Sequence, residues 1–452
     1  MKFYHANCAL LADGVRASVR IAVDNGLIAS VEAGATLSAG DEMIAGLVLP
    51  GMANVHSHSF QRAMAGLAEW DAGGTDNFWS WREAMYRFAE RLDPDSQRDI
   101  ARFLFIEMLK AGYTSVGEFH YLHNQPGGAA FVPMGAMAAA VAEAAHETRI
   151  GLTMLPTLYV TGGADGRALD ERQKRFGKTV EELLRLRSDL KGDAGVTNVG
   201  LALHSLRAVP TASMHEAIAG VEMTSPLHIH AAEQMGEVDE SLATYGLRPV
   251  EYLLKEFRVD RRWCLVHSTH LSEHETVALA HSGAVAGLCP ATEGNLGDGI
   301  FPLPGYLSAG GALAVGGDSH ICVDPAEELR MLEYSQRLLH RRRNVAASAA
   351  QPHTAARLWA LAARGGALAL GLNAGEIAAG MRADLVVVDT DHVSLAGRDG
   401  AQALDSYVFV AGKGAVRDVM VVGAWLVKER HHAGEARAAI AYRSAVKKII
   451  SA

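Results

Sequence analysis

The sequence predicts an α/β protein in which a (β/α)8 TIM-like barrel stands beside a small β-sandwich formed from both ends of the chain. Two observations predict this fold class. Apolar runs of strand length alternate with helical segments after residue 47, which is typical of a parallel sheet covered on both faces. Strand-like sequence without that alternation stands at both ends of the chain. We therefore expect a first sandwich part at 1–46, a barrel at 47–376, and a second sandwich part with a C-terminal helix at 377–452.

The terminal segments carry short strand signals. Residues 19–23 alternate between apolar and polar side chains, the Asp-Asn-Gly sequence at 24–26 is typical of a hairpin turn, and residues 27–31 resume the strand. The second terminal segment has the same texture after residue 377. Its predicted elements are strands at 383–389 and 416–422 and a closing helix at 435–450.

The middle of the chain contains eight apolar runs. The predicted strands are 47–56, 114–119, 150–159, 199–204, 226–230, 263–267, 284–288 and 312–316. Helices are predicted between them at 94–110, 134–147, 179–190, 249–257 and 273–281. Eight strands of this kind favour a closed barrel. An open doubly wound sheet is the alternative, but no Gly-x-Gly-x-x-Gly turn follows the first strand.

Polar side chains stand where several of these strands end. In a (β/α)8 barrel, functional groups gather at the carboxyl ends of the strands, so residues far apart in sequence meet at one face. A further acid, Glu233, follows the fifth strand by a few residues. The residues at the strand ends are His56, His58, His230, His267 and Asp318.

This set of side chains suits a divalent cation. His56 and His58 are two residues apart in a strand and therefore project from the same face. A lone histidine at a strand end is more often structural, and an Asp after Gly-Gly could cap the next helix. The joint occurrence is harder to dismiss, because three histidines and one aspartate can surround one ion and leave a position for water. Imidazole ligands favour Zn²⁺, although Fe²⁺ or Mn²⁺ could occupy the same site.

The chain resembles the amidohydrolase superfamily over essentially its whole length. The matching features are Pro50-Gly51 before the His-x-His pair, His230, His267, and Asp318 in a Gly-Gly-Asp-Ser sequence. Members with two metals usually carry a carboxylated Lys on the fourth strand, and the fourth strand here has none. The His-x-x-Glu sequence ending at Glu233 instead matches the mononuclear deaminase branch. The resemblance therefore implies one metal held by His56, His58, His230 and Asp318, and a barrel beside a sandwich made from both termini.

A narrower resemblance is to the formimidoylglutamate deiminases of histidine degradation. The segments that carry it are 56–62, 79–82, 118–121, 204–209 and 230–233. The resemblance implies hydrolysis of N-formimino-L-glutamate to N-formyl-L-glutamate and ammonia. A bound Zn²⁺ lowers the pKa of its water to about 7, so hydroxide is available for attack at neutral pH. In this scheme Asp318 accepts the proton of the water, His267 orients the attack, and Glu233 passes a proton to the departing nitrogen.

The implied substrate is a small dicarboxylate. Guanidinium groups pair bidentately with carboxylates, which Lys cannot imitate, so Arg82 and Arg207 are the expected carboxylate ligands. We expect Gln61, Tyr121 and His204 to complete the hydrogen bonding. Residues 73–77 are Gly-rich at their start and predict a mobile loop near the mouth of the barrel.

Composition narrows the partners. The chain has 452 residues, a net charge of −9 and no long basic tract, which argues against nucleic acid and anionic membranes. No apolar run approaches the roughly 20 residues that cross a bilayer, and the first 14 residues carry no export signal. Four scattered cysteines suggest reduced thiols in the cytoplasm. Family resemblance suggests a homodimer.

Two other functions stay open at this point. The first is another mononuclear deaminase that acts on a nucleobase-like ring such as guanine or cytosine. The second is a catalytically silent barrel used for assembly. The complete polar set argues against the silent barrel, because buried histidines and acids are costly unless something pairs with them.

Overall fold

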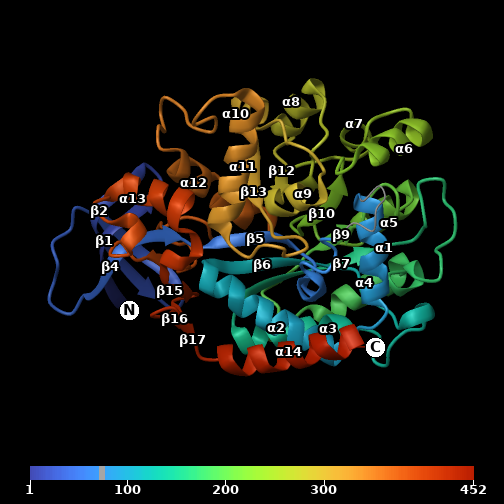
Figure 1. The fold of residues 1–452 in the computed structure, drawn as a ribbon, viewed down its shortest axis with the longest axis horizontal. Helices are drawn as coiled ribbons and strands as arrows, with labels where there is room; N and C mark the ends of the chain where they lie inside the picture. Colours follow the sequence, from blue (N-terminus) through green and yellow to red (C-terminus); the bar gives the residue numbers. More distant parts are fainter. Residues whose placement is uncertain (71–76, 452) are drawn as a thin grey trace.

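The computed structural model describes residues 1–70 and 77–451, and it shows a barrel beside a sheet built from both ends of the chain (Figure 1). Most of the predicted mobile loop at 73–77 lies outside the described residues. Its last residue, Asn77, is the N-cap of helix α1.

The barrel contains eight parallel strand positions, as predicted. Neighbouring strands pair in order around it, and a bridge between Ser57 and Asp318 joins the first strand to the segment after the last. Asp318 N also donates to His56 O at 2.9 Å, which closes the barrel at its carboxyl end. The strands are β5 (Met52–Ser57), β6 (Tyr113–His120), β7 (Gly151–Leu158), β8 (Asn198–Val199), β9 (Leu201–Leu203), β10 (Leu227–Ala231), β11 (Trp263–His267), β12 (Val285–Leu288) and β13 (Ala312–Val315).

One predicted strand is wrong in its first half. The apolar run 47–56 is two strands, because β4 (Glu42–Pro50) pairs with the terminal sheet and only β5 enters the barrel. The chain turns at Gly51, where an added Cβ would lie 2.3 Å from Thr114 Oγ1. Both halves of the run are buried, so the apolar pattern continues unbroken across the turn.

The fourth strand position is interrupted. Gly200 separates β8 from β9, and a Cβ there would lie 2.6 Å from Leu155 Cδ2.

The predicted helices are confirmed to within about two residues at each end. The helices are α1 (Phe78–Ala89), α2 (Pro94–Ala111), α3 (Ala136–Thr148), α4 (Val180–Leu190), α5 (Thr211–Ala219), α6 (Met235–Tyr245), α7 (Pro249–Glu256), α8 (Glu273–Ser282), α9 (Pro290–Leu296), α10 (Leu303–Ser308), α11 (Pro325–His340), α12 (Thr354–Ala369), α13 (Gly400–Ser406) and α14 (Glu435–Ser451).

Both chain ends build one eight-stranded sheet, in the order β17-β16-β15-β14-β4-β1-β2-β3. The two chain ends meet where β4 pairs with β14. The sheet curls over a shared core, since Tyr4 packs edge-on against Trp425 at 5.9 Å and Ile28 N donates to Met381 O. The remaining strands are β1 (Lys2–Leu11), β2 (Gly14–Asp24), β3 (Leu27–Ala33), β14 (Leu385–Val388), β15 (Val416–Val421), β16 (Ala424–Lys428) and β17 (His431–His432).

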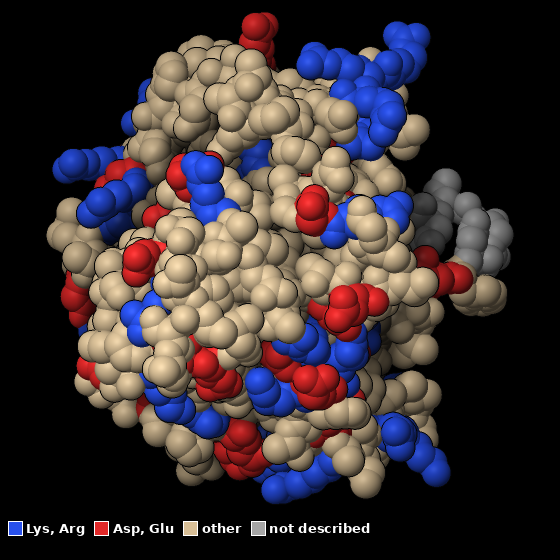
Figure 2. Space-filling model, turned by 90° about the vertical axis from the view of Figure 1, so that its left-hand side faces the viewer, with Lys and Arg blue, Asp and Glu red and all other residues tan. Residues whose placement is uncertain are grey.

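The closing helix α14 packs against the barrel helix α2, where Phe103 and Tyr442 stack at 4.3 Å (Figure 1). No helix within the described ranges is long and apolar enough to cross a membrane. On the face shown in Figure 2, basic and acidic side chains are interspersed. That face therefore presents a mixed surface rather than a field of one sign.

Candidate metal centre and active site

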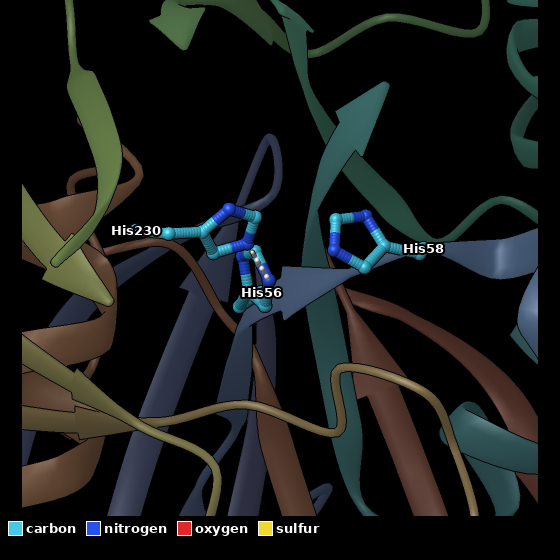
Figure 3. A group of neighbouring side chains, drawn as sticks. All are labelled: His56, His58 and His230. Atoms are coloured by element: carbon cyan, nitrogen blue, oxygen red, sulfur yellow. Dashed lines mark hydrogen bonds between the residues drawn. The ribbon is translucent and has the colours of Figure 1, made fainter. Parts of the chain in front are cut away.

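Four of the predicted ligands meet at one point at the carboxyl end of the barrel. His56 and His58 come from the end of β5 and His230 from β10, and Figure 3 shows their rings facing one another. His230 Nε2 lies 3.0 Å from His56 Nε2. The Oδ1 atom of Asp318 lies 3.4 Å from the Nε2 atoms of both His56 and His58. All four side chains are buried.

The protonation states of these four side chains are the ones that metal binding requires. Burial lowers the pKa of His56 to about 3 and holds that of His230 well below its usual value, so both imidazoles are neutral. Burial alone would raise the pKa of Asp318, but its hydrogen bond with His56 holds that pKa low and keeps the carboxylate ionised. Neutral imidazoles and an ionised carboxylate are the forms that bind a metal.

The orientation of His58 is fixed from behind. Its Nδ1 lies 2.9 Å from the carbonyl oxygen of Phe119, so Nδ1 carries the proton and Nε2 faces the cluster with its lone pair. A hydrogen bond of this kind is how a protein sets the tautomer of a metal-ligating histidine. The residues present therefore fit one divalent cation.

Backbone strain aims several of these side chains. Ala232, His267 and Asp318 have φ values of 52°, 68° and 46°. Non-glycine residues rarely adopt this left-handed region, and such strain gathers at functional sites. Here the left-handed residues stand at the end of the sixth strand and after the ends of the fifth and eighth strands, where Glu233, His267 and Asp318 are directed toward one centre.

The three predicted catalytic residues are mutual neighbours. His267 Nε2 lies 3.7 Å from Glu233 Oε1 and 3.9 Å from Asp318 Oδ2. Burial raises the pKa of Glu233 to about 7, so this acid can hold a proton near neutrality. Burial alone would lower the pKa of His267, but the carboxylates around it, Glu233 first, raise that pKa to about 10. Glu233 and His267 can therefore hold and move protons beside the candidate metal ligands.

All five predicted substrate residues line one cavity above this cluster. Gln61 Nε2 donates to Tyr121 OH at 2.9 Å, and Arg82 Nε donates to Tyr86 OH at 2.6 Å. Arg207 Nε has no hydrogen-bond partner among the described residues although it is buried. The lining residues that the sequence predicts are Gln61, Arg82, Tyr121, His204 and Arg207.

Sequence reasoning missed two supporting acids. Glu293 Oε1 lies 3.3 Å from His267 Nδ1, which orients the ring so that Nε2 faces the site. Glu118, which lies in the segment 118–121 of the family resemblance, accepts hydrogen bonds from Ser57 Oγ, Ser59 N and Ser59 Oγ beside the metal ligands. No periodicity marks either acid, since each becomes relevant only when the barrel closes.

Residues 47–426 match the amidohydrolase family, and the chain belongs to that family. The preceding segment, residues 1–45, matches the N-terminal domain of formimidoylglutamate deiminase HutF. The chain is 45% identical to a formimidoylglutamate deiminase of Pseudomonas aeruginosa, over 98% of each chain. It is 28% identical to an 8-oxoguanine deaminase of the same species, over 84% of this chain and 82% of that one.

Solved structures agree with the fold. An amidohydrolase from Brucella melitensis superposes with a TM-score of 0.94 at 41% identity, over the whole of both chains. An adenosine deaminase from Xanthomonas campestris with bound zinc superposes with a TM-score of 0.81 at 22% identity, over 100% of this chain and 98% of that one. At that identity the second likeness supports the fold alone.

Proposed function

We propose that the protein hydrolyses N-formimino-L-glutamate to N-formyl-L-glutamate and ammonia, a step of histidine degradation. The proposal depends on one observation: two arginines line the same cavity as the candidate metal ligands. Arg82 comes from α1 and Arg207 follows β9, and both line the cavity whose floor contains His58, His230 and Asp318. Two guanidinium groups can bind the two carboxylates of a glutamate skeleton, and a nucleobase has no carboxylates.

His56, His58, His230 and Asp318 would hold one divalent cation, for which we propose Zn²⁺. Such an ion supplies a Lewis acid that lowers the pKa of water to about 7. The protein's own groups then handle the protons. Asp318 accepts a proton from the attacking water, and His267 orients that water from its position between Asp318 and Glu233. Glu233 delivers a proton to the departing nitrogen, because ammonia leaves only when protonated.

Atoms balance in this scheme. The water oxygen forms the new C=O bond at the formimino carbon, the C–N bond to the imino nitrogen breaks, and the water protons leave with ammonia. Arg82 and Arg207 bind the two carboxylates, while Gln61, Tyr121 and His204 supply hydrogen bonds along the cavity wall.

A substrate screen combined with metal analysis tests the proposal. We expect about one divalent ion per chain and ammonia release from N-formimino-L-glutamate that exceeds release from guanine, cytosine and 8-oxoguanine by orders of magnitude. Ammonia appears through a coupled glutamate dehydrogenase assay, and the metal by plasma emission spectroscopy. Preferred turnover of a purine or pyrimidine would reject the assignment in favour of a nucleobase deaminase.

Replacement of either arginine by lysine tests the carboxylate sites. We expect Arg82→Lys and Arg207→Lys each to lower kcat/KM by about 10- to 100-fold, mainly through KM, because one lost charge-assisted hydrogen bond costs about 1.5–3 kcal/mol. Arg87→Lys is the matched control, since Arg87 lies on the same helix α1 but is exposed. Wild-type kinetics in either test variant would remove that arginine from the substrate site.

We also propose a homodimer in the cytoplasm. The four cysteines, all within the described residues, form no disulfide, which suits a reducing compartment. The dimer rests on family resemblance. Light scattering after size-exclusion chromatography tests it, and a monomer at micromolar concentration would refute it.

A further inference from the structure

One tryptophan contacts both arginines of the cavity. The Cζ atom of Arg82 lies 5.5 Å from the centroid of the Trp79 ring, and the Cζ atom of Arg207 lies 5.7 Å from it. Both distances are within the range of a cation–π interaction. Arg82 and Arg207 belong to different parts of the barrel, so Trp79 is a cation–π contact that the two cations share.

The two cations need such a contact. Without a ligand, two guanidinium groups facing one cavity repel each other, and the repulsion favours arrangements in which they separate. Both guanidinium groups act on His204. Burial first, and then the charges of Arg207 and Arg82, hold the pKa of His204 well below its usual value. The negative face of an indole offsets this repulsion without using the hydrogen-bonding edge of either guanidinium.

Free edges are what carboxylates require. An arginine that lies over an aromatic ring still presents its N–H groups in the plane of the guanidinium. Arg207 Nε is buried and lacks a hydrogen-bond partner among the residues described, which leaves a donor for a ligand. Ion pairing of Arg207 to Glu233 is loose, at 4.0 Å.

The position of Trp79 is itself fixed. Asn77 caps α1 by accepting a hydrogen bond from Trp79 N at 2.9 Å, which sets the first turn of the helix. On its other side, the ring edge lies against α6, where a Cβ on Gly236 would be 3.4 Å from Trp79 Cζ2. The indole is therefore held from α1 and from α6, although its surface is 42% exposed.

We propose that Trp79 is a specificity-determining positioning residue, whose indole holds Arg82 and Arg207 together so that the cavity prefers a dicarboxylate over a monocarboxylate. The identity of the dicarboxylate rests on the proposed function. Trp79 acts through the two arginines and has no contact with Glu233, His267 or Asp318 among the ring and charge contacts of the described residues. Its loss therefore weakens binding more than chemistry.

Product binding separates this inference from the reaction itself. Calorimetry measures the affinity of the metal-loaded protein for N-formyl-L-glutamate and for N-formyl-4-aminobutyrate, which lacks the α-carboxylate. We expect Trp79→Leu to weaken N-formyl-L-glutamate binding by about 10- to 30-fold and the monocarboxylate by about 3-fold or less. Trp79→Phe keeps an aromatic face, and we expect it to stay within about 3-fold of wild type for both ligands.

Kinetics give a second readout. In Trp79→Leu we expect KM for N-formimino-L-glutamate to rise about 10-fold or more while kcat changes by less than about 3-fold. Trp425→Leu is the matched control, because Trp425 also makes a cation–π contact, with Lys428 at 4.5 Å, but in the terminal sheet. We expect its affinity and kinetics to match wild type.

The outcomes are distinguishable. A wild-type protein that binds both ligands equally, or neither, has no preference for the dicarboxylate and overturns the role of Trp79, whereas the proposed substrate fails only if ammonia release prefers a nucleobase. A wild-type preference for the dicarboxylate that survives Trp79→Leu overturns the role of Trp79 alone. Equal losses in the Leu and Phe variants would show that the aromatic face is not the cause, and would also overturn it.

Discussion

We expect Glu233→Gln to lower kcat by about 10³-fold while the protein keeps its metal, because a positioned proton donor contributes about 10²–10⁴-fold. Gln keeps the size and the hydrogen-bonding reach of Glu233 but cannot deliver a proton to the departing nitrogen. The side chain stands beside the ligands, with Oε1 at 3.7 Å from His267 Nε2. Ammonia release and metal content are measured on the same preparation.

The control for this variant is Glu240→Gln. Glu240 lies on the neighbouring helix α6 and accepts a hydrogen bond from Ala164 N, outside the cavity. We expect the same chemical change there to leave kcat unaltered. Loss of metal from Glu233→Gln would show that Glu233 is a ligand, and near-normal turnover would assign the proton transfer to another group.

Much of the site follows from elementary geometry. Residues two apart in a strand share a face, which places His56 and His58 together. The carboxyl ends of parallel strands converge, which brings His230, His267 and Asp318 to the same edge. The sequence therefore predicts the cluster without any knowledge of side-chain contacts, and the structure places its members within a few ångströms of one another.

The remaining features depend on tertiary contacts that have no periodic signal. The run 47–56 divides at Gly51 because each half is buried in a different sheet, and hydrophobicity alone does not say which sheet buries a strand. Glu293 reaches His267 only because α9 follows the neighbouring strand β12 in the folded barrel. In the sequence, Trp79 is one of several aromatic residues on a helix. Its contact with Arg207, which comes from a distant segment, exists only in the folded protein.

These missed features share a role. The predicted residues would touch the cation or the substrate. Glu293 and Trp79 instead contact predicted residues from outside, and Glu118 contacts Ser57 and Ser59, the chain neighbours of His58. Supporting residues of this kind orient the groups that they contact, and they follow no fixed spacing in the sequence. Sequence patterns therefore identify the reacting groups more readily than the groups that orient them.

We expect His230→Asn to lose the metal and to lower kcat/KM by about 10³-fold or more. His230 Nε2 faces His56 Nε2 at 3.0 Å, so its removal takes one of three imidazoles from the cluster. The lost ion would have supplied several kcal/mol of transition-state stabilisation, and each 1.36 kcal/mol is tenfold in rate. Plasma emission spectroscopy on the purified variant measures the metal directly.

His228→Gln provides the matched control, because His228 lies on the same strand and face but one layer deeper in the barrel. Its Nε2 bonds the carbonyl oxygen of Ala369 at 2.8 Å, and its ring is fully buried. We expect that change to lower the melting temperature but to keep the metal in the folded protein, since the ligand cluster is untouched. Full metal occupancy in His230→Asn, or equal metal loss in both variants, would contradict a centre built on His56, His58, His230 and Asp318.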